Sequence, residues 1–252
     1  ELSDLKSYLK LIIAYAYIFV TQFYFAYMVG IFTFLFWIIL LFVQKEQSVK
    51  LIIKKSAKYI GSVLLAVGIS AVFLLPAVVF LFNNYGGSGF VNEKFSTQIF
   101  HLFYALFWGN KIPMTNNYPA IYSGWPVLIL VILYFVNRQI SKKEKIISGI
   151  LLGLLTATML IDPLYIFMHA FDEPNALLFR HAFLLVFLLC AIACRQARNY
   201  ADIKWKQTAL IVCVCLGAYM ILERFCSQNT EQIGLRFAVN IVCGIIWIGM
   251  IY

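Results

Sequence analysis

The chain has 252 residues, of which 63% are hydrophobic and only 12% are charged, with a formal net charge of +9. A soluble domain of this length cannot hide so much apolar surface, whereas lipid solvates it directly, so the composition excludes an ordinary soluble protein and predicts an all-α integral membrane protein. The positive charge does not indicate nucleic-acid binding, because it lies in short loops where membrane lipids, with their anionic headgroups, are the expected partners.

The distribution of lysine and arginine predicts the orientation of the spans. Fifteen of the 20 basic residues lie in four clusters, at residues 6–10, 45–58, 138–145 and 195–206. The alternate connections carry only Lys94, Lys111, Arg180, Arg224 and Arg236. Basic residues in short loops are retained in the cytoplasm. The clusters are therefore predicted to be cytoplasmic and the other connections extracytoplasmic.

The first half of the chain predicts three spans and one long loop. Residues 11–43 contain no charge and are too long for one straight span, which favours two spans in an outward hairpin that turns near Thr21 to Tyr24. A third span is predicted over residues 59–82, with a kink at Pro76. Residues 83–122 form an extracytoplasmic loop, in which the aromatic-rich segment 95–108 predicts an interfacial helix.

The second half predicts five further spans. They are expected at residues 124–136, 146–168, 176–193 and 209–222, with the last beginning near Leu235. The whole chain is thus predicted to be a single transmembrane domain, a multispan bundle of about eight helices. Since it begins with Glu1 and its last apolar run stops at Tyr252, it is expected to be a fragment of a longer chain.

Polar residues gather on the predicted outer face after the fifth span. They are Asp162, His169, Asp172, Glu173, Asn175, Arg180 and His181. Ionisable groups at a membrane boundary are usually functional or paired. Asp172 and Glu173 could equally cap the next helix, whose N-terminus favours carboxylates. Arg180 is predicted four residues inside the sixth span, where it could bind phosphate, pair with Asp162 or Asp172, or extend to the interface.

The remaining candidates have ordinary explanations as well. His169 and His181 could act as bases, but their spacing matches no zinc pattern, which favours polar packing and predicts no metal site. Tyr24, near the hairpin tip, could line a groove or belong to an aromatic belt. The six cysteines fall mostly in apolar runs and are expected to be small buried hydrophobic residues. No nucleotide-binding, serine-hydrolase or zinc-protease motif is present.

Several segments together resemble the bacterial membrane protein YfhO family. They are TQFYFAYM at residues 21–28, LP at 75–76, IYSG at 121–124, and DEPN at 172–175 continuing through FRHAF at 179–183. In the last segment His181 and Ala182 stand where the family usually has Tyr-Ser, and Gln22 stands where Asn is common. The resemblance covers most of residues 10–200.

Members of that family resemble multispan glycosyltransferases of the C type (GT-C), which use lipid-phosphate-linked sugars. The resemblance implies a GT-C-like fold, a polyprenyl-phosphate sugar as donor and a cell-envelope glycopolymer as acceptor at the extracytoplasmic face of the bacterial plasma membrane. It implies substrate binding by Tyr24, Tyr122, Asp172, Asn175, Arg180 and His181. The catalytic acid of such enzymes lies near the start of the full protein and is expected upstream of Glu1, and a divalent metal ion is left open as cofactor.

Two other classes of function compete with this reading. A transporter or flippase of lipid-linked saccharide should carry polar groups near the middle of several spans. Such residues are few here (Ser62, Ser70, Thr156 and Thr158), and no inverted pair of halves is visible, which favours the enzyme. A noncatalytic membrane subunit would tolerate the loss of Arg180.

Overall fold

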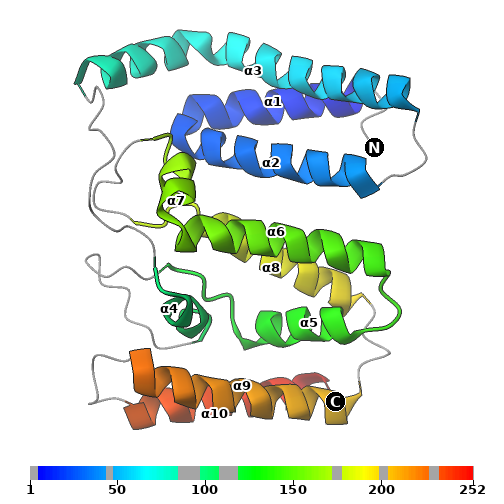
Figure 1. The fold of residues 1–252 in the computed structure, drawn as a ribbon, viewed down its shortest axis with the longest axis vertical. Helices are drawn as coiled ribbons and strands as arrows, with labels where there is room; N and C mark the ends of the chain where they lie inside the picture. The colour runs from blue at the N-terminus through cyan, green and yellow to red at the C-terminus, as the bar shows by residue number, and fades with distance from the viewer. Residues whose placement is uncertain are drawn as a thin grey trace. The chain divides into compact units, whose positions relative to one another are not determined.

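Helices are the only regular secondary structure in the part of the chain that the structure describes. A computed structural model describes residues 5–43, 48–84, 97–107, 119–171, 178–198, 204–226 and 233–251, and these ranges contain helices and no β-strand (Figure 1). The chain divides into two compact units. The first comprises Glu1–Glu93 and Ile166–Glu173, and the second comprises Lys94–Tyr165 and Pro174–Tyr252. The prediction of an all-α membrane protein is confirmed.

The first unit is built on a hairpin of two helices covered by a third. The helices are α1 (Leu5–Thr21), α2 (Phe23–Val43) and α3 (Val49–Asn84). The helical hairpin turns at Gln22, inside the segment predicted from its polar residues. The Tyr15, Thr33 and Tyr59 hydroxyls, one from each helix, hydrogen-bond to one another, with 3.1 Å between Thr33 and Tyr59. Inside an apolar bundle these bonds satisfy polar groups that would otherwise be costly to bury.

Helix α3 is longer than the predicted third span. It begins at Val49, not at residue 59, and continues through Pro76 to Asn84. The extra turns carry four of the five lysines of the second basic cluster, and lysines are good helix formers with long stems that reach water from a helical backbone. Lys58 illustrates this, since its ammonium group lies 5.0 Å from the centre of the Tyr8 ring on α1.

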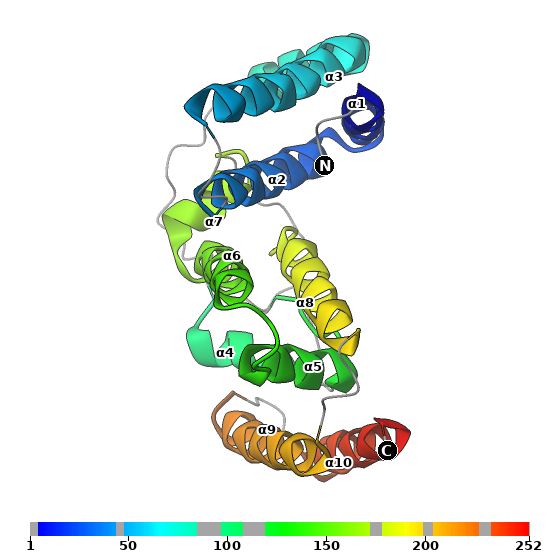
Figure 2. The same cartoon turned by 90° about the vertical axis from the view of Figure 1, so that its right-hand side faces the viewer.

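The second unit contains the remaining spans. Its helices are α4 (Ile99–Tyr104), α5 (Trp125–Val136), α6 (Lys142–Leu160), the first turn of α7 (Asp162–Met168), α8 (Ala182–Ala197), α9 (Trp205–Cys226) and α10 (Ile233–Ile251). α5 packs mainly on α8, and α9 lies beside α10 in both views (Figures 1 and 2). Gly244 permits that approach, because a Cβ there would lie 3.0 Å from Val212 Cγ1.

The fifth span differs from the prediction. Residues 146–168 were expected to form one helix, but the chain bends by 100° between α6 and α7. Ile161 at the corner is extended, with φ −121° and ψ 111°. The cause lies in Pro163, which has no N–H to donate to a continuing helix and whose ring would clash with the carbonyl group one turn earlier. Pro163 is instead well suited to the first turn of α7.

The sixth span and the loop helix differ in their boundaries. α8 begins at Ala182, six residues later than predicted, and turns occupy residues 178–181. Within the predicted interfacial helix, residues 97–107 are described and only α4 is helical. α4 packs on α9, and Figure 1 shows it end-on while α9 is seen lengthwise. The interfacial position of this segment stays a prediction.

The helices suit a lipid environment. Among the described residues, α2, α3 and α9 are long and apolar enough to span a membrane, and the bent pair α6–α7 qualifies as a fourth. α5, α8 and part of α10 are shorter apolar helices. Large apolar side chains face outward, including Val72 with 77% of its surface exposed. The number of about eight spans stays a prediction.

Within each unit, the basic clusters lie at one end. In the first, the start of α1, the end of α2 and the start of α3 lie together (Figure 1). In the second, the same holds for the end of α5, the start of α6, the end of α8 and the start of α9. Glu144 on α6 pairs there with Arg195 on α8 at 2.7 Å. We call this the basic end of each unit, which the positive-inside rule assigns to the cytoplasm.

Candidate functional site

Arg180 lies in a tight turn directly before α8. Residues 178–181 form the turn, in which Phe179 is buried and has a left-handed backbone with φ 55°. The Phe179 N–H donates to the Tyr165 hydroxyl at 3.1 Å, and the two rings contact edge to face at 5.1 Å. Left-handed backbone is costly for a bulky residue, so these contacts are what hold the turn. Tyr165 on α7 thereby positions Arg180.

The position of Arg180 differs from the one predicted. It was expected four residues inside an apolar helix, but it precedes the first residue of α8 and is half-buried. A helix N-terminus carries a partial positive charge, and a guanidinium beside it adds a full one. The Arg180 charge is also close enough to act on the Tyr165 hydroxyl. An anion in this corner would be stabilised by both the arginine and the helix end.

His181 is enclosed next to Arg180. It is fully buried, and its ring lies 5.6 Å from the Tyr165 ring and 6.4 Å from the Phe179 ring. It occupies the N-cap position of α8, where its side chain makes no capping hydrogen bond. These are packing contacts between the imidazole and two aromatic rings. They place His181 behind the turn, where it can support Arg180.

The other predicted site residues are dispersed. Tyr122 belongs to the second unit, where it precedes α5 and keeps 42% of its surface exposed. Partial burial raises the pKa of its hydroxyl, which therefore stays a neutral donor at physiological pH. Tyr24 belongs to the first unit, where its ring lies 6.1 Å from that of His169. Asp172 and Asn175 lie outside the described residues.

A buried ion pair is the polar feature that the sequence analysis missed. Arg236 Nη2 on α10 lies 3.1 Å from Glu223 Oε1 on α9, and their side chains are only 11% and 4% exposed. Tyr104 on α4 donates its hydroxyl hydrogen to Glu223 Oε2 at 2.7 Å. Beside them, Trp125 Nε1 donates to Asn240 Oδ1 at 2.8 Å. The cluster ties α4 and the start of α5 to α9 and α10.

A signal for this pair was present in the sequence. Glu223 and Arg236 are opposite charges near the facing ends of two consecutive apolar helices, where a short connection brings them together. The count of basic residues predicts Arg236 in a connection, whereas it lies on the first turn of α10. Burial of a charge requires a partner and further hydrogen bonds. One oxygen of the Glu223 carboxylate accepts the Tyr104 hydrogen bond, and the other lies against Arg236 Nη2. The geometry therefore indicates a structural role.

Comparison with known proteins decides the family. The family model described as bacterial membrane protein YfhO matches residues 1–251. The chain belongs to the YfhO family. No curated protein and no solved structure matches it.

Membership confirms the resemblance drawn from the short motifs and places this YfhO protein in a bacterial membrane. The described residues of this YfhO protein contain no group of three or more His, Cys, Asp or Glu side chains placed to hold a metal ion. Asp172 and Glu173 are not among those residues. Cys194 and Cys213 are exposed, contrary to the expectation that the cysteines are buried.

Proposed function

We propose that this YfhO protein is part of a membrane glycosyltransferase that moves a sugar from a polyprenyl phosphate to an extracytoplasmic cell-envelope acceptor. In this reaction an acceptor hydroxyl oxygen forms a bond to the anomeric carbon of the sugar. The bond from that carbon to the phosphate oxygen breaks, and polyprenyl phosphate leaves. A carboxylate base, which the family resemblance implies, takes the acceptor's proton. The proposal rests on family membership together with Arg180.

Arg180 supplies what the leaving group needs. Negative charge develops on the phosphate as the sugar departs. Positive groups stabilise this charge most effectively when their position is fixed before the reaction. The Tyr165–Phe179 hydrogen bond fixes the turn that carries Arg180. The N-terminus of α8 supports the same charge. Asp172, Asn175, Tyr24 and Tyr122 remain proposed substrate contacts on the strength of the resemblance, whereas the buried His181 would act by supporting Arg180.

The surface of α8 suits the lipid tail of the donor. Phe183 and Phe187 lie on the first two turns of α8, and 37% and 61% of their surfaces are exposed. Residues four apart lie on one face of a helix. A phosphate held at Arg180 would therefore lie at the head of an apolar, aromatic stripe. A prenyl chain can follow that stripe along the helix while the sugar faces water.

Mid-span polar groups favour the enzyme over a transporter. Ser62 Oγ donates to the Lys58 carbonyl at 2.8 Å, and Thr158 Oγ1 donates to the Leu155 carbonyl at 2.7 Å, both within their own helices. Ser70 Oγ donates to the Ala16 carbonyl at 3.2 Å, which joins α3 to α1. These hydroxyls are engaged in packing the helices. They do not outline a polar path across the described spans.

The test is sugar transfer by the full-length protein in proteoliposomes that contain a polyprenyl-phosphate-linked hexose, with release of polyprenyl phosphate as the readout. Arg180→Ala is expected to lower the rate by about 10²–10³-fold, the usual effect of removing one charge-stabilising group. Arg180→Lys is expected to restore part of it, because Lys keeps the charge but not the bidentate geometry.

Arg224→Ala is the matched control, because Arg224 is exposed near the end of α9 and its loss removes the same charge. This variant should keep the wild-type rate. Wild-type transfer by a membrane-inserted Arg180→Ala protein would exclude the proposed role of Arg180. Absence of polyprenyl phosphate release by the wild-type protein with any lipid-linked sugar would argue for the noncatalytic subunit instead.

A further inference from the structure

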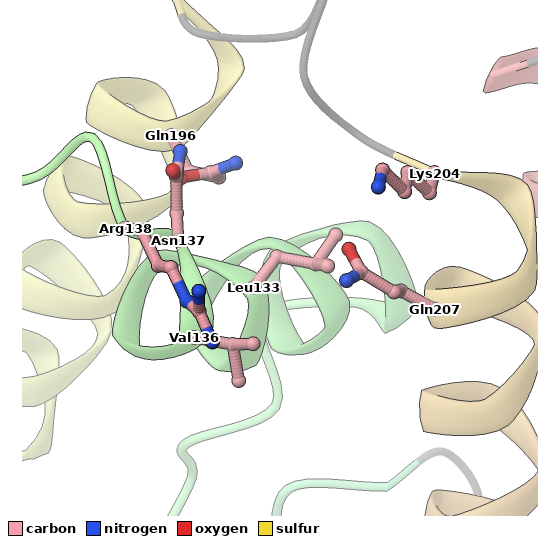
Figure 3. Close-up of a pocket in the computed structure, with 7 residues that line it drawn as sticks. All are labelled: Leu133, Val136, Asn137, Arg138, Gln196, Lys204 and Gln207. Carbon is pink, nitrogen blue, oxygen red and sulfur yellow. The ribbon is translucent and has the colours of Figure 1, made fainter.

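A pocket opens at the basic end of the second unit, at the opposite end of α8 from Arg180. It has a volume of about 510 Å³ and lies between the ends of α5 and α8 on one side and the start of α9 on the other (Figure 3). Its lining residues are Leu133, Val136, Asn137, Arg138, Gln196, Lys204 and Gln207. The proposed sugar transfer makes no use of it.

The orientation of a buried amide makes this pocket a donor site. The Gln139 backbone N–H, which can only donate, bonds to Asn137 Oδ1 at 2.9 Å. The Asn137 amide must therefore present its nitrogen to Gln196, whose Oε1 accepts that bond at 3.1 Å. Consequently the Gln196 NH₂ group faces away from Asn137. The hydrogen-bond network thus determines the orientation of both the Asn137 and the Gln196 amide.

Gln196 is held rigidly but is incompletely bonded. It is 1% exposed, and its NH₂ group has no hydrogen-bond acceptor among the residues that the structure describes. In Figure 3 the amide of Gln196 faces the open space toward Lys204. This donor opens onto the pocket, so the pocket is suited to a ligand that brings an acceptor.

The charges of the pocket specify the kind of acceptor. Arg138 and Lys204 contribute two cations, and none of the described lining residues is acidic. Neither cation has an acidic partner within the described part of the chain, where Glu144 is paired with Arg195. Guanidinium, ammonium and amide donors around one space are the complement of a phosphate group, which offers several acceptor oxygens.

The position of the pocket specifies the source of the phosphate. Leu133 and Val136 give it an apolar wall, and Val136 is 55% exposed at the end of an apolar helix. The positive-inside rule assigns this end to the cytoplasmic surface, where anionic lipids concentrate. We propose that the pocket binds the phosphate of an anionic phospholipid headgroup in the inner leaflet, with the Gln196 amide, Arg138 and Lys204 as donors and the acyl chains against Leu133 and Val136.

The experiment is native mass spectrometry of the full-length protein purified with phosphatidylglycerol. The wild-type protein is expected to retain one phosphatidylglycerol molecule that the double variant Arg138→Gln/Lys204→Gln loses, with affinity reduced at least about tenfold for two lost charge-assisted bonds. Gln196→Leu is expected to weaken retention too. Lys206→Gln is the matched control, because Lys206 is exposed nearby but does not line the pocket.

Three outcomes would overturn the proposal. The first is equal retention by the wild type and the double variant, which would show that the lipid binds elsewhere. The second is equal loss in Lys206→Gln, which would reduce the effect to net charge. The third is protection against thermal unfolding by inorganic phosphate at the same concentration as by phosphatidylglycerol, which would make the pocket a site for a soluble anion. Arg138 and Lys204 are exposed, so the double variant is expected to fold normally even if Gln196→Leu does not.

Discussion

At the scale of single residues, the buried pair Glu223–Arg236 links α9 to α10 in the second unit. Both charges lie in apolar helices and are almost fully shielded, so each requires the other and the Tyr104 hydroxyl. Removal of one member of such a pair leaves an uncompensated charge, which costs more than the pair contributes. The pair is therefore a point of vulnerability, and it also specifies which face of α10 meets α9.

At this scale we expect Glu223→Ala to lower the free energy of unfolding by about 3–5 kcal/mol, because it removes the carboxylate that lies 3.1 Å from the buried Arg236 guanidinium. Tyr104→Phe should cost about 1.5–3 kcal/mol, the usual range for a hydrogen bond to a charged group. Denaturant unfolding of the purified protein in detergent measures both. The exposed Arg224→Ala should change stability little. Equal stability of Glu223→Ala and Arg224→Ala would show that Arg236 reaches water.

Among the elements, the α6–α7 corner decides where Arg180 lies. Pro163 ends the fifth span early and turns the chain by 100°, which brings Tyr165 against the turn before α8. Hydropathy did not reveal the corner, because the segments before Asp162 and after Pro163 are both apolar. Its consequence is that Arg180 precedes the helix, where the helix end adds to its charge instead of being shielded by apolar turns.

This arrangement predicts a positioning role for Tyr165. Tyr165→Phe removes the acceptor of the Phe179 N–H, loosens the turn and should lower the rate of sugar transfer by about tenfold, the equivalent of one hydrogen bond. The loss should appear in kcat more than in KM if Arg180 acts mainly on the departing phosphate. Tyr134→Phe removes a comparable hydroxyl bond, to Ser148 at 2.9 Å near the basic end, and should leave transfer unchanged. Equal losses in both variants would indicate general destabilisation.

On the scale of the whole molecule, the grouping of basic clusters predicts one orientation in the membrane. In a variant whose native cysteines are replaced, Ser88→Cys and Asn117→Cys should react with an impermeant thiol reagent added to intact cells. Lys143→Cys at the basic end should react only after the cells are opened. Labelling of Lys143→Cys in intact cells would invert the orientation, and with it the faces proposed for sugar transfer and for phospholipid binding.

The sequence by itself determined the membrane character, the helical class, the family and the approximate positions of the helices, because apolar length and loop charge are local properties of the chain. Gln22 at the hairpin turn and the start of α5 beside Gly124 were predictable for the same reason. Only the tertiary structure decided the bend at Pro163, the turn that carries Arg180, the Glu223–Arg236 pair and the orientation of the Gln196 amide. Each of these depends on which side chains meet across helices, and such contacts are not encoded in the periodicity of any one segment.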